Sequence, residues 1–257
     1  MDKVTVIIPV YNRVNLALNA IWSVLRQTYP SIELIVVDDG SEQDMSMIDG
    51  LRHRFNESRM FFVHQSHRGP AAARNVGLGL VTPDTRYVAF LDADDYWANN
   101  KVENQAAMMK DNPRAVMSHT SYYITNGRSI VGLSHAGSFG GKIFPRMLFN
   151  CPITTSSVMI AHGITRKFRF RTDMECVEDI VAWAEIAKLG DVIGIDAFLT
   201  TITQDENSGS INKEKQLRGI NNLIEYIKGD ADIGWVTALR LLWRWNKIRG
   251  QLCRSRE

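Results

Sequence analysis

The segment Tyr87–Trp97, YVAFLDADDYW, carries an apolar run straight into a group of carboxylates. Its first five residues have the composition of a strand that is buried on both faces. Asp92, Asp94 and Asp95 then follow within four positions. Carboxylates that lie close together repel one another and are costly to desolvate. The pattern therefore suggests that the carboxylates at the end of this strand bind a ligand.

Strands and helices alternate before and through this segment. Apolar, β-branched runs predict buried strands, and apolar residues at helical spacing predict the helices between them. The predicted strands are residues 4–10, 32–39, 60–65 and 86–95, and the predicted helices are residues 15–27, 47–55 and 69–80. Gly69 and Pro70 open the last helix, where proline is tolerated in the first turn. This order predicts an α/β fold with a mostly parallel sheet and helices on both faces.

Polar residues gather where three of these strands end. The clusters are Tyr11 to Arg13, Asp38 to Ser41, and Asp92 to Asp95. A single Asp-Gly-Ser group is also common turn chemistry, and an aspartate also caps helices. In parallel sheets, however, ligands bind at the carboxyl ends of the strands. Three clusters at one predicted edge therefore favour a binding site over three unrelated turns.

The overall composition excludes several classes of protein. The hydrophobic content is 45%, the charged content is 23% and the net charge is +2, which does not suggest general nucleic-acid binding. The three cysteines form no CxxC pair, so neither a disulfide framework nor a zinc site is indicated. The N-terminal apolar run does not resemble a signal peptide, and no run has the roughly 18 apolar residues of a membrane span. We expect a cytoplasmic protein.

The Asp-x-Asp pair itself matches one kind of ligand site. An EF-hand needs an oxygen ligand and then a glycine where this chain has Tyr96 and Trp97. A dinucleotide site needs GxGxxG after the first strand, where this chain reads PVYNRVN. Asp-x-Asp at a strand end can instead bring two carboxylates to one hard divalent cation that carries a diphosphate.

Four motifs resemble a known family when they are taken in order. VIIPVYNR, VVDDGS, GPAAARNVG and FLDADD are similar to the inverting family 2 glycosyltransferases of the GT-A fold, and the resemblance covers roughly residues 4 to 205. CPITTSSVMI, from Cys151, resembles the acceptor-side strand of that family. ECVEDIVAWAEIAKLG, from Glu175, resembles its Glu-Asp helix. The resemblance implies a nucleotide-sugar donor, a divalent metal and inversion at the anomeric carbon.

The resemblance also implies roles for the residues of the first half. The nucleotide sugar would lie against Pro9, Val10, Tyr11, Asp39, Arg74, Asp92 and Ala93. Asp39 would accept a hydrogen bond from N3–H of uracil or thymine, which favours a UDP or dTDP donor. Asp94, with Asp92, would bind Mn²⁺ or Mg²⁺.

Further residues are assigned in the second half of the chain. By the same resemblance, Asp179 would be the catalytic base, with Glu178 beside it. Acids also favour the first turn of a helix for electrostatic reasons alone. Trp183 lies four and five residues beyond this pair, close to the same helical face. It either stacks on an acceptor sugar or packs in the core, and the sequence leaves both readings open.

The chain divides into a catalytic domain over residues 1–211 and a helical extension over residues 212–257. Within the domain, residues 1–98 would form the nucleotide-sugar half and residues 99–211 the acceptor half. The tail from Ile233 to Arg256 holds three tryptophans and many basic residues but no acid. Such a helix either lies in a membrane interface or packs on the domain with its arginines in water.

These features predict a metal-dependent inverting glycosyltransferase. It would move a sugar from a nucleoside-diphosphate sugar to a hydroxyl of a glycan or lipid-linked acceptor, in the synthesis of a cell-surface polysaccharide. Two alternatives remain. A nucleotidyltransferase is expected to carry a glycine-rich, basic loop after the first strand, and PVYNRVN is neither. A non-catalytic sugar-nucleotide-binding module would have no need of Asp94 and Asp179. The tail suggests peripheral contact with the inner face of the cell membrane.

Overall fold

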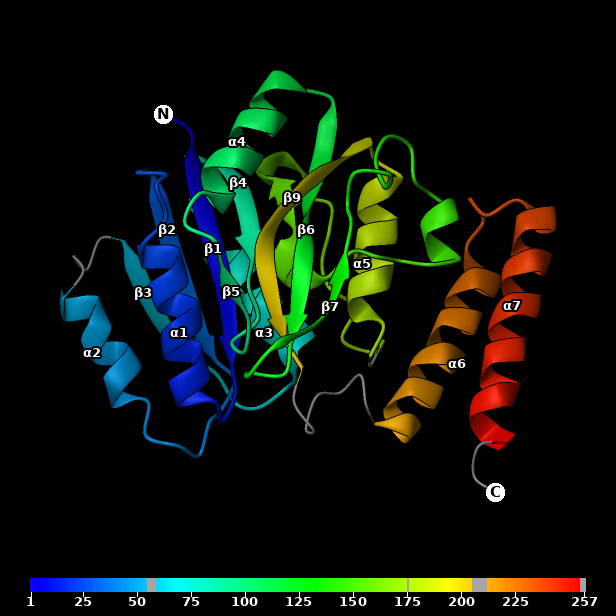
Figure 1. The fold of residues 1–257 in the computed structure, drawn as a ribbon, viewed down its shortest axis with the longest axis horizontal. Coiled ribbons are helices and arrows are strands. Elements are labelled where there is room, and N and C mark those ends of the chain that lie inside the picture. Colours follow the sequence, from blue (N-terminus) through cyan, green and yellow to red (C-terminus); the bar gives the residue numbers. More distant parts are fainter. Residues whose placement is uncertain (55–58, 175, 205–211, 255–257) are drawn as a thin grey trace.

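A single mixed sheet runs through the computed structural model, which describes residues 1–54, 59–174, 176–204 and 212–254. Within these ranges the sheet has nine strands in the order β3-β2-β1-β4-β8-β6-β9-β5, with β7 paired to β6 (Figure 1). The first four strands are parallel to one another, as predicted. They are β1 (Lys3–Val10), β2 (Ile32–Asp38), β3 (Met60–His64) and β4 (Thr85–Phe90).

Alternate residues of these strands point into two different cores. Ile7, Val88 and Phe90 face one core, whereas Val6, Ile8 and Leu34 face the other. Both faces of the sheet are therefore dry, which explains why the strands read as continuous apolar runs. The connecting helices are α1 (Val14–Leu25), α2 (Ser46–Arg54) and α3 (Pro70–Leu80).

Helix α3 lies unusually close to β1. A Cβ atom built on Gly77 would come within 2.5 Å of Cγ2 of Ile7, whereas one built on Gly79 would meet nothing within 4 Å. Glycine at position 77 therefore lets the helix backbone approach the strand that leads to Pro9 and Tyr11.

The second half of the chain adds strands of both directions. β8 runs antiparallel to β4 and β6, and β9 runs parallel to β6. β5 pairs with β9 and therefore lies at the far edge of the sheet from β3. The elements are β5 (Tyr96–Trp97), α4 (Lys101–Asp111), β6 (Ala115–Thr125), β7 (Ile130–Ser134), η1 (Arg146–Leu148), η2 (Thr155–Ser157), β8 (Met159–Ala161), η3 (His162–Ile164), α5 (Glu178–Ala187) and β9 (Asp191–Thr203).

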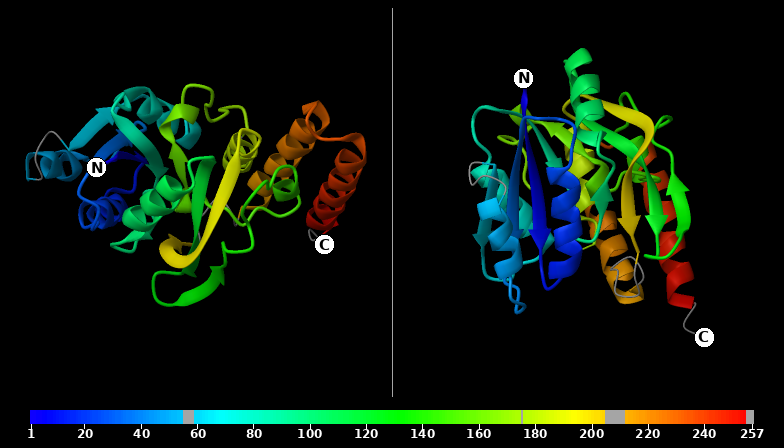
Figure 2. Two further views of the ribbon diagram at one scale, coloured as in Figure 1. Left: turned by 90° about the horizontal axis from the view of Figure 1, so that it is seen from above. Right: turned by 60° about the vertical axis from the view of Figure 1, so that its left-hand side comes forward.

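Helices α6 (Lys213–Gly229) and α7 (Trp235–Arg254) form the predicted extension, and they lie side by side at one end of the molecule (Figures 1 and 2). Leu223, Ile227 and Leu241 are buried in the same core as Phe90 and Trp183. The extension therefore completes the core on this face of the sheet. The predicted boundary at residue 211 lies outside the described residues. Among the helices described, none combines the length and hydropathy that crossing a bilayer requires.

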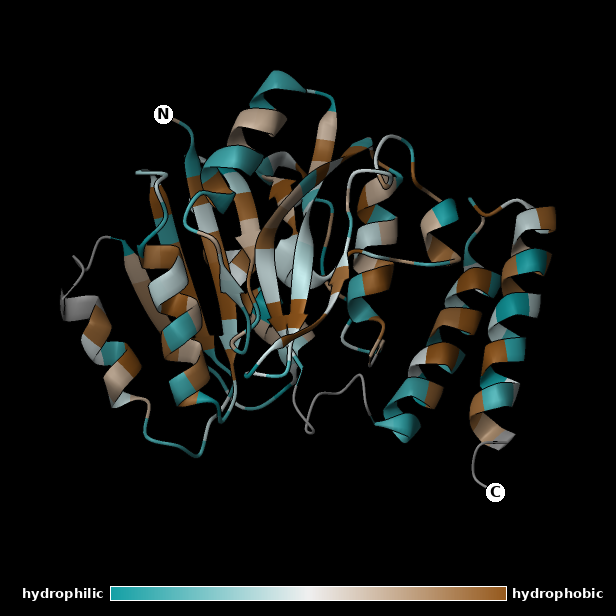
Figure 3. Ribbon diagram, in the orientation of Figure 1, coloured by the Kyte–Doolittle hydropathy of each residue, from teal (hydrophilic) through white to brown (hydrophobic). Residues whose placement is uncertain are grey.

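Helix α7 packs through one face only. Leu241 is fully buried, and Trp245 Nε1 donates a hydrogen bond to the carbonyl of Leu148 at 2.9 Å. Trp235, Leu239 and Trp243 are 76%, 59% and 69% exposed. Apolar and polar turns alternate along the helix in Figure 3. The predicted packing on the domain is confirmed for one face of α7, and the predicted membrane contact stays a prediction for the other.

Candidate active site

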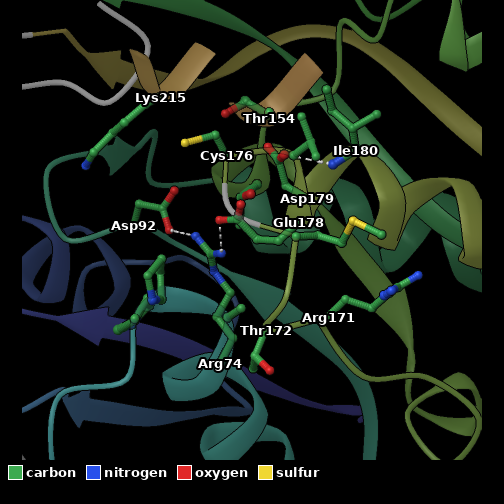
Figure 4. A pocket seen from close by; sticks show the side chains of 18 of the residues that line it. Arg74, Asp92, Thr154, Arg171, Thr172, Cys176, Glu178, Asp179, Ile180 and Lys215 are labelled. Carbon is green, nitrogen blue, oxygen red and sulfur yellow. Dashed lines mark hydrogen bonds and ion pairs between the residues drawn. The ribbon is translucent and has the colours of Figure 1, made fainter. Parts of the chain in front are cut away.

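A cavity of about 1190 Å³ opens at the carboxyl ends of β1, β2 and β4. Its walls come from both halves of the catalytic domain and from α6 and α7. All predicted site residues except Trp183 line it, and Figure 4 shows part of the lining. They are Pro9, Val10, Tyr11, Asp39, Arg74, Asp92, Ala93, Asp94, Glu178 and Asp179. The sequence clusters thus meet in one place, while their individual roles stay predictions.

The carboxylate of Asp39 organises the loop that leads into α3. Its Oδ1 accepts hydrogen bonds from Gln65 Nε2 at 2.5 Å and the Arg68 amide at 2.9 Å. Its Oδ2 accepts from the Gly69 amide at 2.8 Å and lies 2.9 Å from His67 Nδ1. These four partners use the lone pairs of the carboxylate. A base can contact Asp39 as predicted only if one of them gives way.

His67 is the partner of Asp39 that is best placed to move. Its ring is half exposed and stacks on Tyr11, with the ring centroids 4.0 Å apart. Tyr11 is itself 40% exposed and faces the cavity. The aromatic surface and the carboxylate that the family resemblance assigns to the nucleobase are therefore both contacted by one imidazole ring.

The three aspartates that follow β4 have different structural roles. Asp95 is buried, and burial, followed by the charges of Asp92 and Asp94, raises its pKa well above the ordinary value. Its carboxyl contacts the Ser156 hydroxyl at 2.5 Å and the Thr203 amide at 2.9 Å. Ser156 Oγ in turn accepts a hydrogen bond from the Asp92 amide at 3.0 Å. Asp95 thus fixes the turn, whereas Asp92 and Asp94 line the cavity.

Each of the two cavity aspartates is paired with an arginine. Asp92 accepts a hydrogen bond from Arg74 at 2.6 Å, and Asp94 forms an ion pair with Arg13. Across the described residues, no group of three or more metal-ligating side chains is preassembled. The donor set nevertheless fits a hard divalent cation, because two carboxylates one residue apart supply oxygen ligands and a bound diphosphate supplies more. A cation on Asp94 would compete with Arg13 for that carboxylate.

The Glu-Asp pair begins α5 and lines the cavity (Figure 4). Glu178 Oε1 lies 3.6 Å from Arg74 Nη1, so its charge is already balanced. Asp179 Oδ1 accepts a hydrogen bond from the Ile180 amide at 2.7 Å. Burial, and then the charge of Glu178, raise the pKa of Asp179 to about 7.

The structure corrects the sugar-stacking reading of Trp183. Its side chain is fully buried and packs against Phe90 and Phe170, with ring centroids 5.7 and 5.6 Å away. No part of the ring reaches the cavity, so core packing is the right reading. Trp183 lies on the inner side of α5, and helical spacing from Asp179 alone does not distinguish that side from the cavity side.

His67 and Lys215 are among the cavity residues that were not assigned a role from the sequence. No sequence pattern pointed to His67, because it is a single histidine in a loop whose conformation depends on contacts with Asp39. Lys215 lies in the first turn of α6 and lines the cavity. Its contribution to the cavity follows from how α6 packs, which no local pattern predicts.

The sequence model of the family described as "Glycosyl transferase family 2" matches residues 5–170. The chain belongs to this family. It is 36% identical to an uncharacterized glycosyltransferase of Rickettsia conorii over 232 residues, which are 89% of this chain and 37% of the relative. The chain thus spans little more than a third of that relative.

A second member of the family is similar over most of both chains. It is the UDP-Glc:alpha-D-GlcNAc-diphosphoundecaprenol beta-1,3-glucosyltransferase WfgD of Escherichia coli, which is 33% identical over 222 residues. These residues are 84% of this chain and 82% of WfgD.

Among solved structures, TarS 1-349 of S. aureus in complex with UDP superposes with a TM-score of 0.72 at 18% identity. The match covers 99% of this chain and 73% of the TarS chain. At this identity the likeness concerns the fold alone, and it confirms the predicted GT-A fold of this family 2 chain.

Proposed function

We propose that this family 2 protein is an inverting glycosyltransferase that uses a nucleoside-diphosphate sugar, with UDP or dTDP favoured. One observation carries the proposal. Asp179, whose carboxyl group has a pKa of about 7, lines the same cavity as Asp92 and Asp94 but belongs to a different wall of it. This separation suits a reaction in which the donor is held at one side and the acceptor hydroxyl is deprotonated at the other.

The donor side would bind the nucleotide through the ends of β1, β2 and β4. Tyr11 offers an aromatic face, and Asp39 offers a carboxylate behind it. The Arg74 guanidinium is buried between two acids, and these acids, against the opposing effect of burial, raise its pKa further. It would stay charged and attract the diphosphate. The presence of UDP in the TarS structure supports this class of donor by fold analogy.

Asp94, together with Asp92, would hold Mn²⁺ or Mg²⁺. Such a cation, when it is bound with the donor, offsets the negative charge that develops on the leaving diphosphate. Arg13 balances Asp94 in the structure, and it would be released toward the phosphates when the cation takes that carboxylate. The carboxylate oxygens of Asp92 and Asp94, two residues that line the cavity, support this assignment.

Asp179 would take the proton from the acceptor hydroxyl. A sugar hydroxyl is a poor nucleophile near neutral pH, and a general base works best when its pKa lies near the working pH. Glu178 is less suited to this task because it already balances Arg74. Attack from the side opposite the leaving diphosphate inverts the anomeric carbon, and the placement of Asp179 on the acceptor wall supports that direction.

We further propose that the acceptor is a glycan or a lipid-linked saccharide, and that the enzyme works at the inner face of the cell membrane in the synthesis of a cell-surface polysaccharide. The name of WfgD describes a diphosphoundecaprenol-linked acceptor, which supports this class. The cavity reaches α6 and α7, so its acceptor side extends beyond the sheet.

A turnover assay tests the proposal. The full chain is incubated with UDP- and dTDP-sugars and a lipid-linked N-acetylglucosamine acceptor, with Mn²⁺ or Mg²⁺ and with excess EDTA. We expect a product of inverted anomeric configuration, formed only when the metal is present. Asp94→Ala should abolish transfer and weaken metal-dependent UDP binding while keeping the far-UV spectrum. Full activity in EDTA, or a retained anomeric configuration, would refute the mechanism.

A further inference from the structure

Helix α7 has an outward face with no partner in the described structure. Trp235, Leu239 and Trp243 follow at four-residue spacing and therefore lie along one side of the helix. Their exposed fractions of 76%, 59% and 69% place them among the most exposed large apolar residues of the molecule. Figure 1 shows α7 at the end of the molecule farthest from α2.

A basic row runs beside these residues. Arg240 is exposed, and Lys247 lies one turn beyond Trp243. Arg244 is also exposed, but its Nε donates a hydrogen bond to the Phe149 carbonyl at 2.7 Å, so Arg240 and Lys247 carry the free charges of this row. Lys247 Nζ lies 5.2 Å from the ring centroid of Trp243, which joins the two rows. The helix contains no acidic residue. A surface that is apolar along one row and cationic along the next matches a membrane with anionic headgroups.

The opposite face of α7 belongs to the cavity. Trp245, Ile248 and Leu252 line it, together with residues of α6. One helix therefore carries the exposed apolar row on one side and a wall of the reaction cavity on the other. An acceptor whose saccharide is attached to a lipid in the membrane would enter beside this wall without leaving the bilayer.

We propose that Trp235, Leu239, Trp243 and the neighbouring basic residues dock the enzyme on an anionic lipid surface, so that the acceptor side of the cavity meets the bilayer. The docking surface is argued from α7 alone, whereas the benefit for the acceptor rests on the proposed function. A second copy of the chain fits the surface less well. An isologous contact would place the basic rows of the two copies against each other.

Vesicle co-sedimentation of the full chain tests the docking surface. We expect binding to phosphatidylcholine vesicles that contain phosphatidylglycerol, little binding to pure phosphatidylcholine, and release at high salt. Trp235→Ala with Trp243→Ala should lower the partition coefficient by about tenfold or more. Arg240→Glu with Lys247→Glu should do the same on anionic vesicles. Brominated lipids should quench the tryptophan fluorescence of the wild type more than that of the tryptophan variant.

Matched controls separate the surface from general apolarity and charge. Ile130→Ala with Leu133→Ala removes apolar residues of similar exposure from β7, and Lys110→Glu with Arg114→Glu reverses two exposed charges near the end of α4. Both controls should bind vesicles as the wild type does. The proposal is overturned if the wild type does not bind anionic vesicles, if the controls lose binding equally, or if the tryptophan pair instead holds a dimer together.

The acceptor step has a separate readout. Turnover of a short-chain, water-soluble diphosphate-linked N-acetylglucosamine should be unchanged in the tryptophan variant, whereas turnover of the long-chain form in vesicles should fall at least severalfold. Equal loss on both acceptors would refute the link between docking and acceptor delivery. If the wild type turns over neither acceptor but binds vesicles, the proposed function fails and the docking surface stands.

Discussion

Arg74 links the acids of the two cavity walls. It contacts Asp92, which follows β4, and Glu178, which begins α5, and it is 4% exposed. Its Nε and Nη1 atoms make no hydrogen bond within the described structure. A single buried cation is therefore shared between two carboxylates. Its charge also lowers the pKa of a third, Asp179, but does not offset burial and the charge of Glu178, which raise that pKa.

Asp179→Asn tests the base. The amide is nearly isosteric but cannot take a proton, so turnover should fall by about 10² or more while UDP binding stays within a few-fold of the wild type. In the wild type, kcat/KM should rise with pH and level off above about 7, since the base must be ionised. If Glu178→Gln is inactive and Asp179→Asn is active, the two acids have the opposite roles.

The same aspartate should make stability depend on pH. An unfolded aspartate has a pKa near 3.9, whereas that of folded Asp179 is about 7. The folded state therefore binds the proton more tightly, and the stability gained from it is lost as pH rises between these values. Urea denaturation should show Asp179→Asn gaining stability relative to the wild type from pH 5 to pH 8. A difference that does not change with pH would contradict the raised pKa.

At the scale of elements, hydrophobic periodicity predicted those strands and helices that depend only on the local sequence. The four parallel strands and the helices between them were predicted from residues 4 to 95, because burial on both faces makes the strands uniformly apolar. The side of α5 that carries Trp183 was not predicted, since Asp179 and Trp183 are close in helical angle. The engagement of Asp39 with the loop at residues 65–69 was also missed, because that contact joins β2 to the start of α3.

The close packing of α3 on β1 can be tested with two glycines of one helix. Gly77→Ala should cost about 1–3 kcal/mol of unfolding free energy, because the new methyl group meets Ile7 at 2.5 Å. Gly79→Ala should gain about 0.5–1 kcal/mol, since nothing lies within 4 Å and alanine favours the helix. Chemical denaturation of both variants gives the comparison. Equal effects of the two substitutions would show that the contact with Ile7 does not limit packing.

At the scale of the whole molecule, the sequence predicted which residues form the helical extension but not how its helices pack. Its amphipathic pattern predicted helices over residues 212–257, and either packing or membrane contact suited that pattern. The structure shows that α6 and α7 bury Leu223, Ile227 and Leu241 in the central core. Which apolar residues face the domain depends on contacts between segments far apart in the chain, for example between Trp245 and Leu148.

Removal of residues 212–257 should therefore unfold the protein or lower its stability by more than about 5 kcal/mol, because several large apolar side chains lose their core contacts together. A melting curve and a far-UV spectrum measure this loss. The Trp235→Ala and Trp243→Ala pair provides the control, since both side chains are exposed and should leave the melting temperature nearly unchanged. A stable truncated protein would show that the extension is a separate appendage.

The continuous sheet restricts how members of this family can be recombined. Tyr87 to Ala89 of β4 pair with residues of β8, and Tyr96 and Trp97 of β5 pair with β9. In a chimera joined near residue 98, β4 and β5 would come from one parent and β8 and β9 from the other. The strand registers of the two parents would therefore have to match. An exchange of residues 212–257 alone crosses no strand pair of the described sheet, so it has to preserve only helical contacts with the core and the cavity. The two terminal helices are therefore the segment that can be exchanged between relatives without a change in strand register.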